Sequence, residues 1–280
     1  MKKFLAVFDG YKMSESTMEY AIQLTKLTGA HLVGVFLNEF IYHSYSAYQV
    51  MTTYKNYEEV LKQLDAKDAE KREEAALEFQ KVCEKAGIRF SVHKDKDIAI
   101  QELKRESMFA DLIIINESET FTKYKETLPT RFIKDLLVDV QCPVLVVPSS
   151  FKPISKIILL YDGAPASLHA IKMFSYVLGN PQHLPVEVFT VKEQKKQNRH
   201  LPNNKLMREF IKRHFPKAIF TVAKGDAEIE ISHYLRNHTE HEVVVLGAYQ
   251  RSDLSRWFKM SMADVLMKEL NMPLFIAHNK

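Results

Sequence analysis

A short apolar run that ends in Asp-Gly occurs twice in this chain, and this repeat constrains the fold more than any other feature. The first copy, KFLAVFDG, covers residues 3–10, and the second, KIILLYDG, covers residues 156–163. Each copy is followed by apolar residues at helical spacing, over residues 14–27 and 166–178. The same unit of strand, turn and helix is therefore predicted twice.

Four more strand-like runs follow in each half, in matching order. They lie at residues 30–37, 88–93, 111–115 and 143–147 in the first half and at residues 186–191, 218–223, 242–246 and 273–277 in the second. Near-continuous apolar strands that alternate with helices indicate a parallel sheet covered on both faces. The sequence therefore predicts an α/β fold of two tandem doubly wound, Rossmann-like domains, each with a five-stranded parallel sheet and four helices.

The predicted domain boundary is the stretch PSSFKP at residues 148–153, which is too short to act as a flexible tether. The length of 280 residues fits two domains, at residues 1–149 and 153–280, and we expect them to pair with each other within the chain. With 46% hydrophobic and 26% charged residues, the composition is that of a globular protein and excludes the disordered and fibrous classes.

The two halves differ between their second and third predicted strands. The first half inserts an aromatic-rich loop at residues 40–57 and then a long amphipathic helix at about residues 58–86. The second half has a basic connection at residues 192–214, so its helix there should be shorter. The loop carries Tyr42, Tyr45, Tyr48, Tyr54 and Tyr57. These rings either form a lid or a contact with a protein partner, or cover a flank of their own domain.

Charge and cysteine content exclude several classes of partner and compartment. The net charge of +4, from 39 basic and 35 acidic residues, is too small to indicate a polyanion, and the basic connection lacks interleaved aromatic rings, so no nucleic acid is expected. Cys83 and Cys142 have no disulfide or zinc spacing, which fits a reducing cytoplasm. The first apolar run breaks at Asp9, as a strand rather than an export signal would, and no run approaches the roughly 20 apolar residues that cross a bilayer. No membrane partner is expected.

With an Asp-Gly after strand one, an apolar-Gly after strand four and a Pro-apolar strand five, the chain resembles the universal stress protein family. The resemblance covers nearly the whole chain except residues 40–57. It implies an adenine nucleotide alpha hydrolase-like fold and a tendency to form homodimers. In one branch of the family, the motif G-x-x-G-x9-G-[ST] after strand four holds ATP.

This motif is eroded in the second half, at residues 247–261. Gly247 and Ser261 match it, whereas Gln250 and Met260 stand at two of the glycine positions. Glycine amides approach phosphates closely and a helix N-terminus supplies further donors, so a side chain at a glycine position blocks the approach or strains the backbone. We therefore expect a degenerate phosphate cradle there.

The aligned stretch in the first half, residues 116–131, contains no glycine. The stretch starts at Asn116, and counting back from Pro143 places Thr130 and Arg131 where the motif has Gly-Ser. The phosphate cradle of the first half is expected to be lost.

The resemblance implies which residues would form each pocket. The candidate nucleotide-binding residues in the second half are Asp162, Val191, Leu246, Gly247, Ser261 and Met262, and those of the degenerate first pocket are Asp9, Leu37, Asn116, Thr130 and Arg131. Carboxyl ends of parallel strands are where doubly wound folds bind ligands. The structural alternative is that Asp9 and Asp162 cap the loop or helix that follows, and that Ser261 is a helix N-cap.

Hydrolytic catalysis has no clear support in the sequence, because neither a G-x-S-x-G elbow nor a Walker lysine motif is present. His233, His238 and His241 lie near one helix end without Cys or acidic ligands at site-like spacing, so no metal is predicted. We therefore expect a non-enzymatic, regulatory or ligand-sensing protein of the stress response. The alternatives are ATP or another adenine nucleotide bound in the second domain, and a protein-interaction module with no functional pocket.

Overall fold

The computed structural model describes residues 1–11, 13–37, 47–95, 99–122, 125–180, 182–194, 200–237, 241–247 and 262–278. The strands of the first half are β1 (Lys3–Asp9), β2 (His31–Leu37), β3 (Phe90–Asp95), β4 (Leu112–Asn116) and β5 (Val144–Val147). Those of the second half are β6 (Lys156–Leu160), β7 (Val186–Lys192), β8 (Ile219–Lys224), β9 (Glu242–Gly247) and β10 (Leu274–Ala277). The predicted strands are therefore present in both halves.

Helices connect these strands. The first half contains α1 (Glu15–Thr28), α2 (Ala47–Thr53), α3 (Tyr57–Ala86), α4 (Ala99–Ser107) and α5 (Arg131–Asp139). The second half contains α6 (Pro165–Val177), α7 (Asn204–His214), α8 (Ala227–Arg236) and α9 (Met262–Glu269). α7, with 11 residues, is much shorter than the 30-residue α3, as predicted for the basic connection at residues 192–214.

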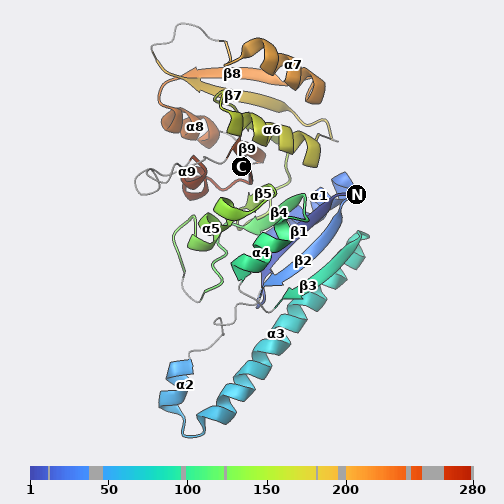
Figure 1. The fold of residues 1–280 in the computed structure, drawn as a ribbon, viewed down its shortest axis with the longest axis vertical. Helices are drawn as coiled ribbons and strands as arrows, with labels where there is room; N and C mark the ends of the chain where they lie inside the picture. The colour runs from blue at the N-terminus through green and yellow to red at the C-terminus, as the bar shows by residue number, and fades with distance from the viewer. Residues whose placement is uncertain are drawn as a thin grey trace.

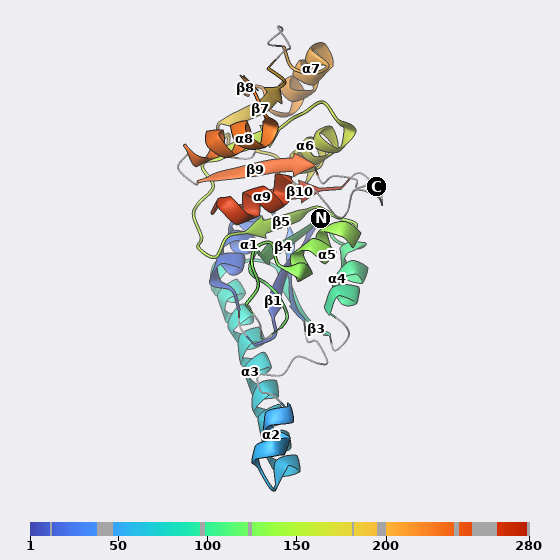
Figure 2. The same cartoon turned by 90° about the vertical axis from the view of Figure 1, so that its left-hand side faces the viewer.

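All of these strands belong to one sheet, in the order β3-β2-β1-β4-β5-β10-β9-β6-β7-β8. Read outward from the centre, each half has the same order, and its strands are parallel. The two parallel sets meet where β5 pairs antiparallel with β10, with Leu145 opposite Phe275. The doubly wound α/β prediction is confirmed, but the sequence had indicated two five-stranded sheets, whereas the structure joins them into one. Figures 1 and 2 show how this sheet twists along its length.

Both faces of the sheet are covered by helices, and each face has a hydrophobic core that runs through both halves. One core includes Phe79 of α3 and Phe174 of α6, and the other includes Leu103 of α4 and Leu266 of α9. Parallel strands buried on both faces explain why the strand sequences are apolar at nearly every position.

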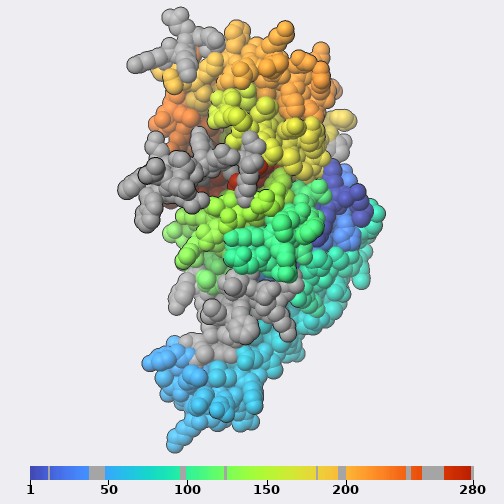
Figure 3. Space-filling model, viewed as in Figure 1, coloured from blue at the N-terminus to red at the C-terminus, as the bar shows by residue number. Residues whose placement is uncertain are grey.

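The α2–α3 segment projects from the body of the molecule, as the lower end of Figures 1 to 3 shows. Residues 40–57 were predicted as a loop, and this is wrong in part, because α2 lies within them. Residues 38–46, with Tyr42 and Tyr45, lie outside the described residues. The buried side chains of α3 all lie from Asp68 onward, so its first turns are not covered by the body. Tyr48 and Tyr54 are exposed on this projection rather than packed on a flank of the domain.

None of the described helices has both the length and the apolar character needed to cross a membrane.

Candidate functional site

The candidate site lies at the carboxyl ends of the parallel strands, where doubly wound folds bind ligands. In the second half, Asp162 follows β6 and is exposed. Its Oδ1 atom accepts hydrogen bonds from the Ala164 N–H at 2.8 Å and from the Ser167 hydroxyl at 2.6 Å. Asp162 thus shapes the turn that leads into α6, which is the capping role considered as the structural alternative.

The turn after Asp162 is in contact with the segment that precedes α7. Gly163 has φ of 90°, and a Cβ atom there would come within 2.5 Å of the Pro202 Cβ atom. Only glycine fits this position, because a side chain would be strained by the positive φ and would clash with Pro202. Burial raises the pKa of the Tyr161 hydroxyl, and a hydrogen bond with Asn203 partly offsets that rise. The segment at residues 201–203 is therefore held against the strand ends.

Gly247, at the end of β9, allows the first turn of α6 to approach closely. A Cβ atom at this position would lie 2.5 Å from the carbonyl carbon of Ala166 and 2.7 Å from the Ser167 nitrogen. This close contact is a sufficient reason for a glycine at residue 247, so phosphate binding is not needed to explain it. A glycine shared with the family motif thus has a structural role in this chain.

The structure brings part of the predicted second pocket together. Val191 near the end of β7 is half-buried, Leu246 on β9 is buried, and both strands lie beside β6, which ends before Asp162. Met262 begins α9, as predicted for the helix there. Ser261 lies outside the described residues, as do Gln250 and Met260.

Side chains of α3 lie close to the corresponding edge of the first half. The Asp9 Oδ1 atom accepts a hydrogen bond from the Tyr11 N–H at 3.0 Å. The Arg72 guanidinium lies over the Tyr11 ring, 4.4 Å from its centroid, and donates to the Tyr11 hydroxyl. That hydroxyl in turn donates to Asp68 Oδ2 at 3.2 Å, and Asp68 is only 1% exposed. Arg72 also lies close to the turn at Gly10, because a Cβ atom added there would lie 3.4 Å from the Arg72 Cγ atom.

Burial raises the pKa of Tyr11, Arg72 opposes this rise, and Asp68 adds to it. Tyr11 is therefore a neutral hydrogen-bonding group between a cation and an anion. Sequence reasoning missed Asp68 and Arg72, and their only signal was the spacing of four residues that places them on one face of a helix.

The predicted phosphate positions of the first half are occupied by internal hydrogen bonds. Thr130 is the N-cap of α5: its hydroxyl accepts from the Ile133 N–H at 3.2 Å and donates to the Glu119 carbonyl at 2.5 Å. The Glu126 carboxylate accepts from the Arg131 N–H at 2.6 Å. A carboxylate of the chain itself thus lies at the anion-attracting end of this helix.

Asn116 and Arg131, two further candidate residues of the first half, differ in burial. Asn116 is buried; its amide donates to the Pro148 carbonyl at 3.3 Å, and its Oδ1 atom accepts from the Ser118 N–H at 2.9 Å. The Arg131 side chain is exposed and lies 3.7 Å from Asp135. Leu37, at the end of β2, is buried. Asn116 therefore holds the segment between the halves, and Arg131 points to solvent.

A buried carboxyl group, Glu117, follows Asn116 in the same region. Burial raises its pKa to about 7, against the opposing effect of a backbone hydrogen bond from Ser149. The Glu117 N–H donates to the Val147 carbonyl at 2.9 Å. This carboxyl group was not singled out by its sequence, in which it is one of many acidic residues.

Among the residues that the structure describes, no three His, Cys, Asp or Glu side chains are grouped so that they could hold a metal ion. His238 lies outside those residues.

The sequence matches no protein-family model, and no curated protein is similar to it in sequence. Solved structures are similar in fold. A universal stress protein from Archaeoglobus fulgidus DSM 4304 has a TM-score of 0.64 and 16% identity, over 99% of this chain and 98% of that one. A functionally unknown protein from Pseudomonas aeruginosa PAO1 has a TM-score of 0.58 and 14% identity, over 99% and 92%. A putative universal stress protein from Pseudomonas aeruginosa UCBPP-PA14 has a TM-score of 0.57 and 16% identity, over 99% and 93%. The chain thus has the fold of universal stress proteins along its whole length.

Proposed function

We propose that this protein acts in a stress response as a non-catalytic regulatory or ligand-sensing protein, in which only the second half keeps a site open to a ligand. The observation that carries the proposal is the difference between the two strand edges. In the first half, Tyr11, Asp68 and Arg72 form a bonded cluster over the edge. In the second half, Asp162 at the equivalent position is exposed.

The arrangement of charged groups supports binding rather than turnover. Each edge carboxylate accepts from a backbone N–H of its own turn, Asp9 from Tyr11 and Asp162 from Ala164. A carboxylate held in this way has a structural task in its own turn.

An adenine nucleotide is the second candidate, because the predicted residues lie at one edge of the sheet. Asp162, Val191, Leu246 and Gly247 come from the ends of neighbouring strands. In this proposal they line the adenine and ribose, and the phosphates are assigned to Met262 at the start of α9 and to Ser261, which precedes it in the sequence. The contact of Gly247 with α6 leaves less reason to assign that glycine to phosphate binding.

The pairing of β5 with β10 supports a further part of the proposal. We infer that the two halves take the place of two chains, so that one polypeptide supplies the pair that a homodimer supplies elsewhere. A third possibility, a protein partner on the projecting α2–α3 segment, is supported by the exposed rings of Tyr48 and Tyr54.

Calorimetric titration with ATP and with AMP tests the proposal. We expect the wild-type protein to bind one of them, Asp162→Ala to weaken binding at least tenfold, and Asp9→Ala, the matched change in the first half, to leave it unaltered. Asp162→Asn removes the charge but keeps an oxygen that can accept from Ala164 and Ser167. Comparing it with Asp162→Ala therefore distinguishes the effect of the charge from the effect of the turn.

Absence of binding heat at millimolar nucleotide would rule out the adenine-nucleotide site. An equal effect of the two aspartate changes would refute the asymmetry. Steady release of phosphate from ATP, abolished by Asp162→Ala, would show that the protein is an enzyme.

A further inference from the structure

A cavity lies between the two halves, on the face of the sheet that α1 and α6 cover. The cavity has a volume of about 40 Å³ and is partly open to solvent. One wall is the C-terminal part of α1, and the other is the end of α6 with the loop that follows it. Because these helices run antiparallel to the strands, the cavity lies at the opposite edge of the sheet from Asp162.

The walls are mostly aliphatic. Apolar side chains come from both halves: Leu24, Leu27, Ile154, Ile157, Phe174, Leu178, Leu184 and Val243. None of the described residues that line the cavity is ionisable. A charged ligand would therefore lose its hydration without gaining a counter-charge, and a neutral one is favoured.

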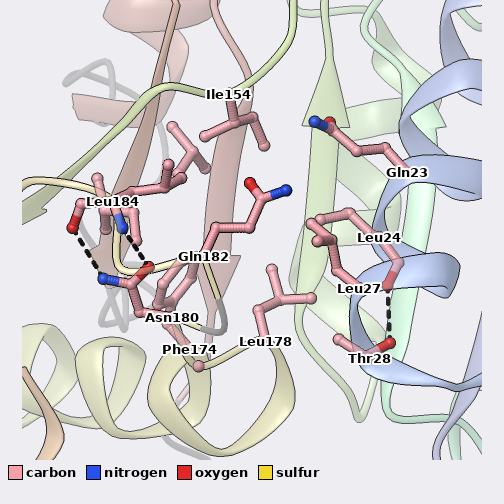
Figure 4. A pocket seen from close by; sticks show the side chains of 13 residues that line it. Gln23, Leu24, Leu27, Thr28, Ile154, Phe174, Leu178, Asn180, Gln182 and Leu184 are labelled. Carbon is pink, nitrogen blue, oxygen red and sulfur yellow. Dashed lines mark hydrogen bonds between the residues drawn. The ribbon is translucent and has the colours of Figure 1, made fainter.

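Most of the polar groups in the walls are already used. The Thr28 hydroxyl donates to the Leu24 carbonyl at 2.7 Å. The Asn180 amide donates to the Leu184 carbonyl and accepts from the Leu184 N–H, each at 2.8 Å. Figure 4 draws these bonds as dashed lines. They stabilise the walls and leave little hydrogen-bonding capacity for a ligand.

Gln23 differs from these two residues. Its Oε1 atom is buried and has no hydrogen-bond partner among the described residues. In Figure 4 the side-chain amides of Gln23 and Gln182 extend toward each other from opposite walls. A buried acceptor without a donor costs free energy, so a group that fills the cavity and brings a donor would recover that loss.

We propose that this cavity is a binding site for a small neutral amphipathic molecule, with a linear aliphatic chain between α1 and α6 and a hydroxyl group that donates to Gln23. The small volume of about 40 Å³ suits an unbranched chain better than a ring system. Since α1 belongs to the first half and α6 to the second, the bound molecule contacts both halves. This site is independent of the nucleotide site proposed above.

Titration of the full chain with 1-hexanol, followed by NMR of the leucine methyl groups, tests the proposal. We expect saturable shifts of the Leu24, Leu178 and Leu184 methyl signals. Gln23→Leu, which keeps the volume and removes the acceptor, should weaken binding about fivefold. Gln101→Leu, the same change at an exposed position on α4, should leave binding unaltered. Gln23→Met replaces Gln23→Leu if the latter does not fold.

Three results would overturn the proposal. One is that these methyl signals do not move with 1-hexanol up to its solubility limit, as expected if the cavity holds only water or stays closed. Another is that Gln23→Leu binds 1-hexanol as tightly as the wild type does. The third is that hexanoate, with a charged end, binds as tightly as 1-hexanol.

Discussion

The ring of Phe79 on α3 lies against the backbone of Gly34 on β2, so closely that a Cβ atom at residue 34 would come within 2.7 Å of the Phe79 Cζ atom. Phe79 also makes edge contacts with Phe8 and Phe36, at centroid distances of 5.7 and 5.8 Å. The long helix is thereby anchored on the sheet by one ring that fits over one glycine.

Gly34→Ala should therefore destabilise the protein by about 1–3 kcal/mol, because the added methyl group forces the Phe79 ring out of its site. Phe79→Ala should cost about 3–5 kcal/mol through the cavity that it leaves. Urea denaturation followed by circular dichroism measures both. Leu77→Ala, at an exposed position of the same helix, is the control and should change the free energy of unfolding little. A neutral effect of Gly34→Ala would show that the ring adjusts freely.

Glu117 should make stability depend on pH near neutrality. Below pH of about 4.5 its carboxyl group is protonated in both the folded and the unfolded state. As pH rises from there to about 7, the folded protein holds this proton more tightly, so stability falls with rising pH, by up to about 3 kcal/mol.

Glu117→Gln removes this dependence and should stabilise the protein at pH 8 but not at pH 4. Denaturation midpoints across that range measure the difference. Glu78→Gln, on the exposed surface of α3, serves as the control. If the stabilities of the wild type and Glu117→Gln changed with pH in the same way, the raised pKa of Glu117 would be contradicted.

Thr130→Ala should destabilise the protein by about 1–2 kcal/mol, because the Ile133 N–H loses its N-cap acceptor and the Glu119 carbonyl loses a donor. Thr130→Ser retains the hydroxyl group and should retain most of the stability. Thermal unfolding of both variants decides the matter: equal melting temperatures for alanine and serine would exclude the cap as the reason for this residue.

Arg72→Met should lower the free energy of unfolding by about 2–4 kcal/mol. The change removes the cation near the buried Asp68 carboxylate and keeps much of the side-chain volume. In the Asp68→Asn background the same change should cost less, because no buried charge then remains. A double-mutant cycle measured by urea denaturation gives the coupling free energy. Additive effects would mean that Arg72 and Asp68 act independently.

Most of the fold was predictable because parallel strands covered on both faces leave continuous apolar runs, as in the repeated Asp-Gly units. The joining of the halves was not predictable. Leu145 and Phe275 are apolar and fully buried. Strands that pair within one chain and strands that pair between two chains both need such residues, so the sequences of β5 and β10 do not show which pairing occurs. The helix α2 was missed because its sequence carries little helical signal. Its one buried apolar side chain, Val50, gives no periodic pattern that would indicate a helix.

The candidate site was predictable only where residues follow a strand directly. Asp162 and Gly247 could be placed from the strand pattern, and the turn at Asp162 was among the structural alternatives. Asp68 and Arg72 could not be, because they lie in a long charged helix whose rotation over the sheet is set by Phe79 and Gly34. Their role depends on tertiary packing rather than on local sequence.

The antiparallel ladder between β5 and β10 has a consequence for biosynthesis. A growing chain exposes β5 as an open edge, with unpaired backbone groups, until β10 has left the ribosome. During that interval the edge of β5 can pair with β5 or β10 of another chain, since both provide complementary strands. We therefore expect crowded synthesis to yield some strand-exchanged dimers, and slow translation of the second half to increase their share.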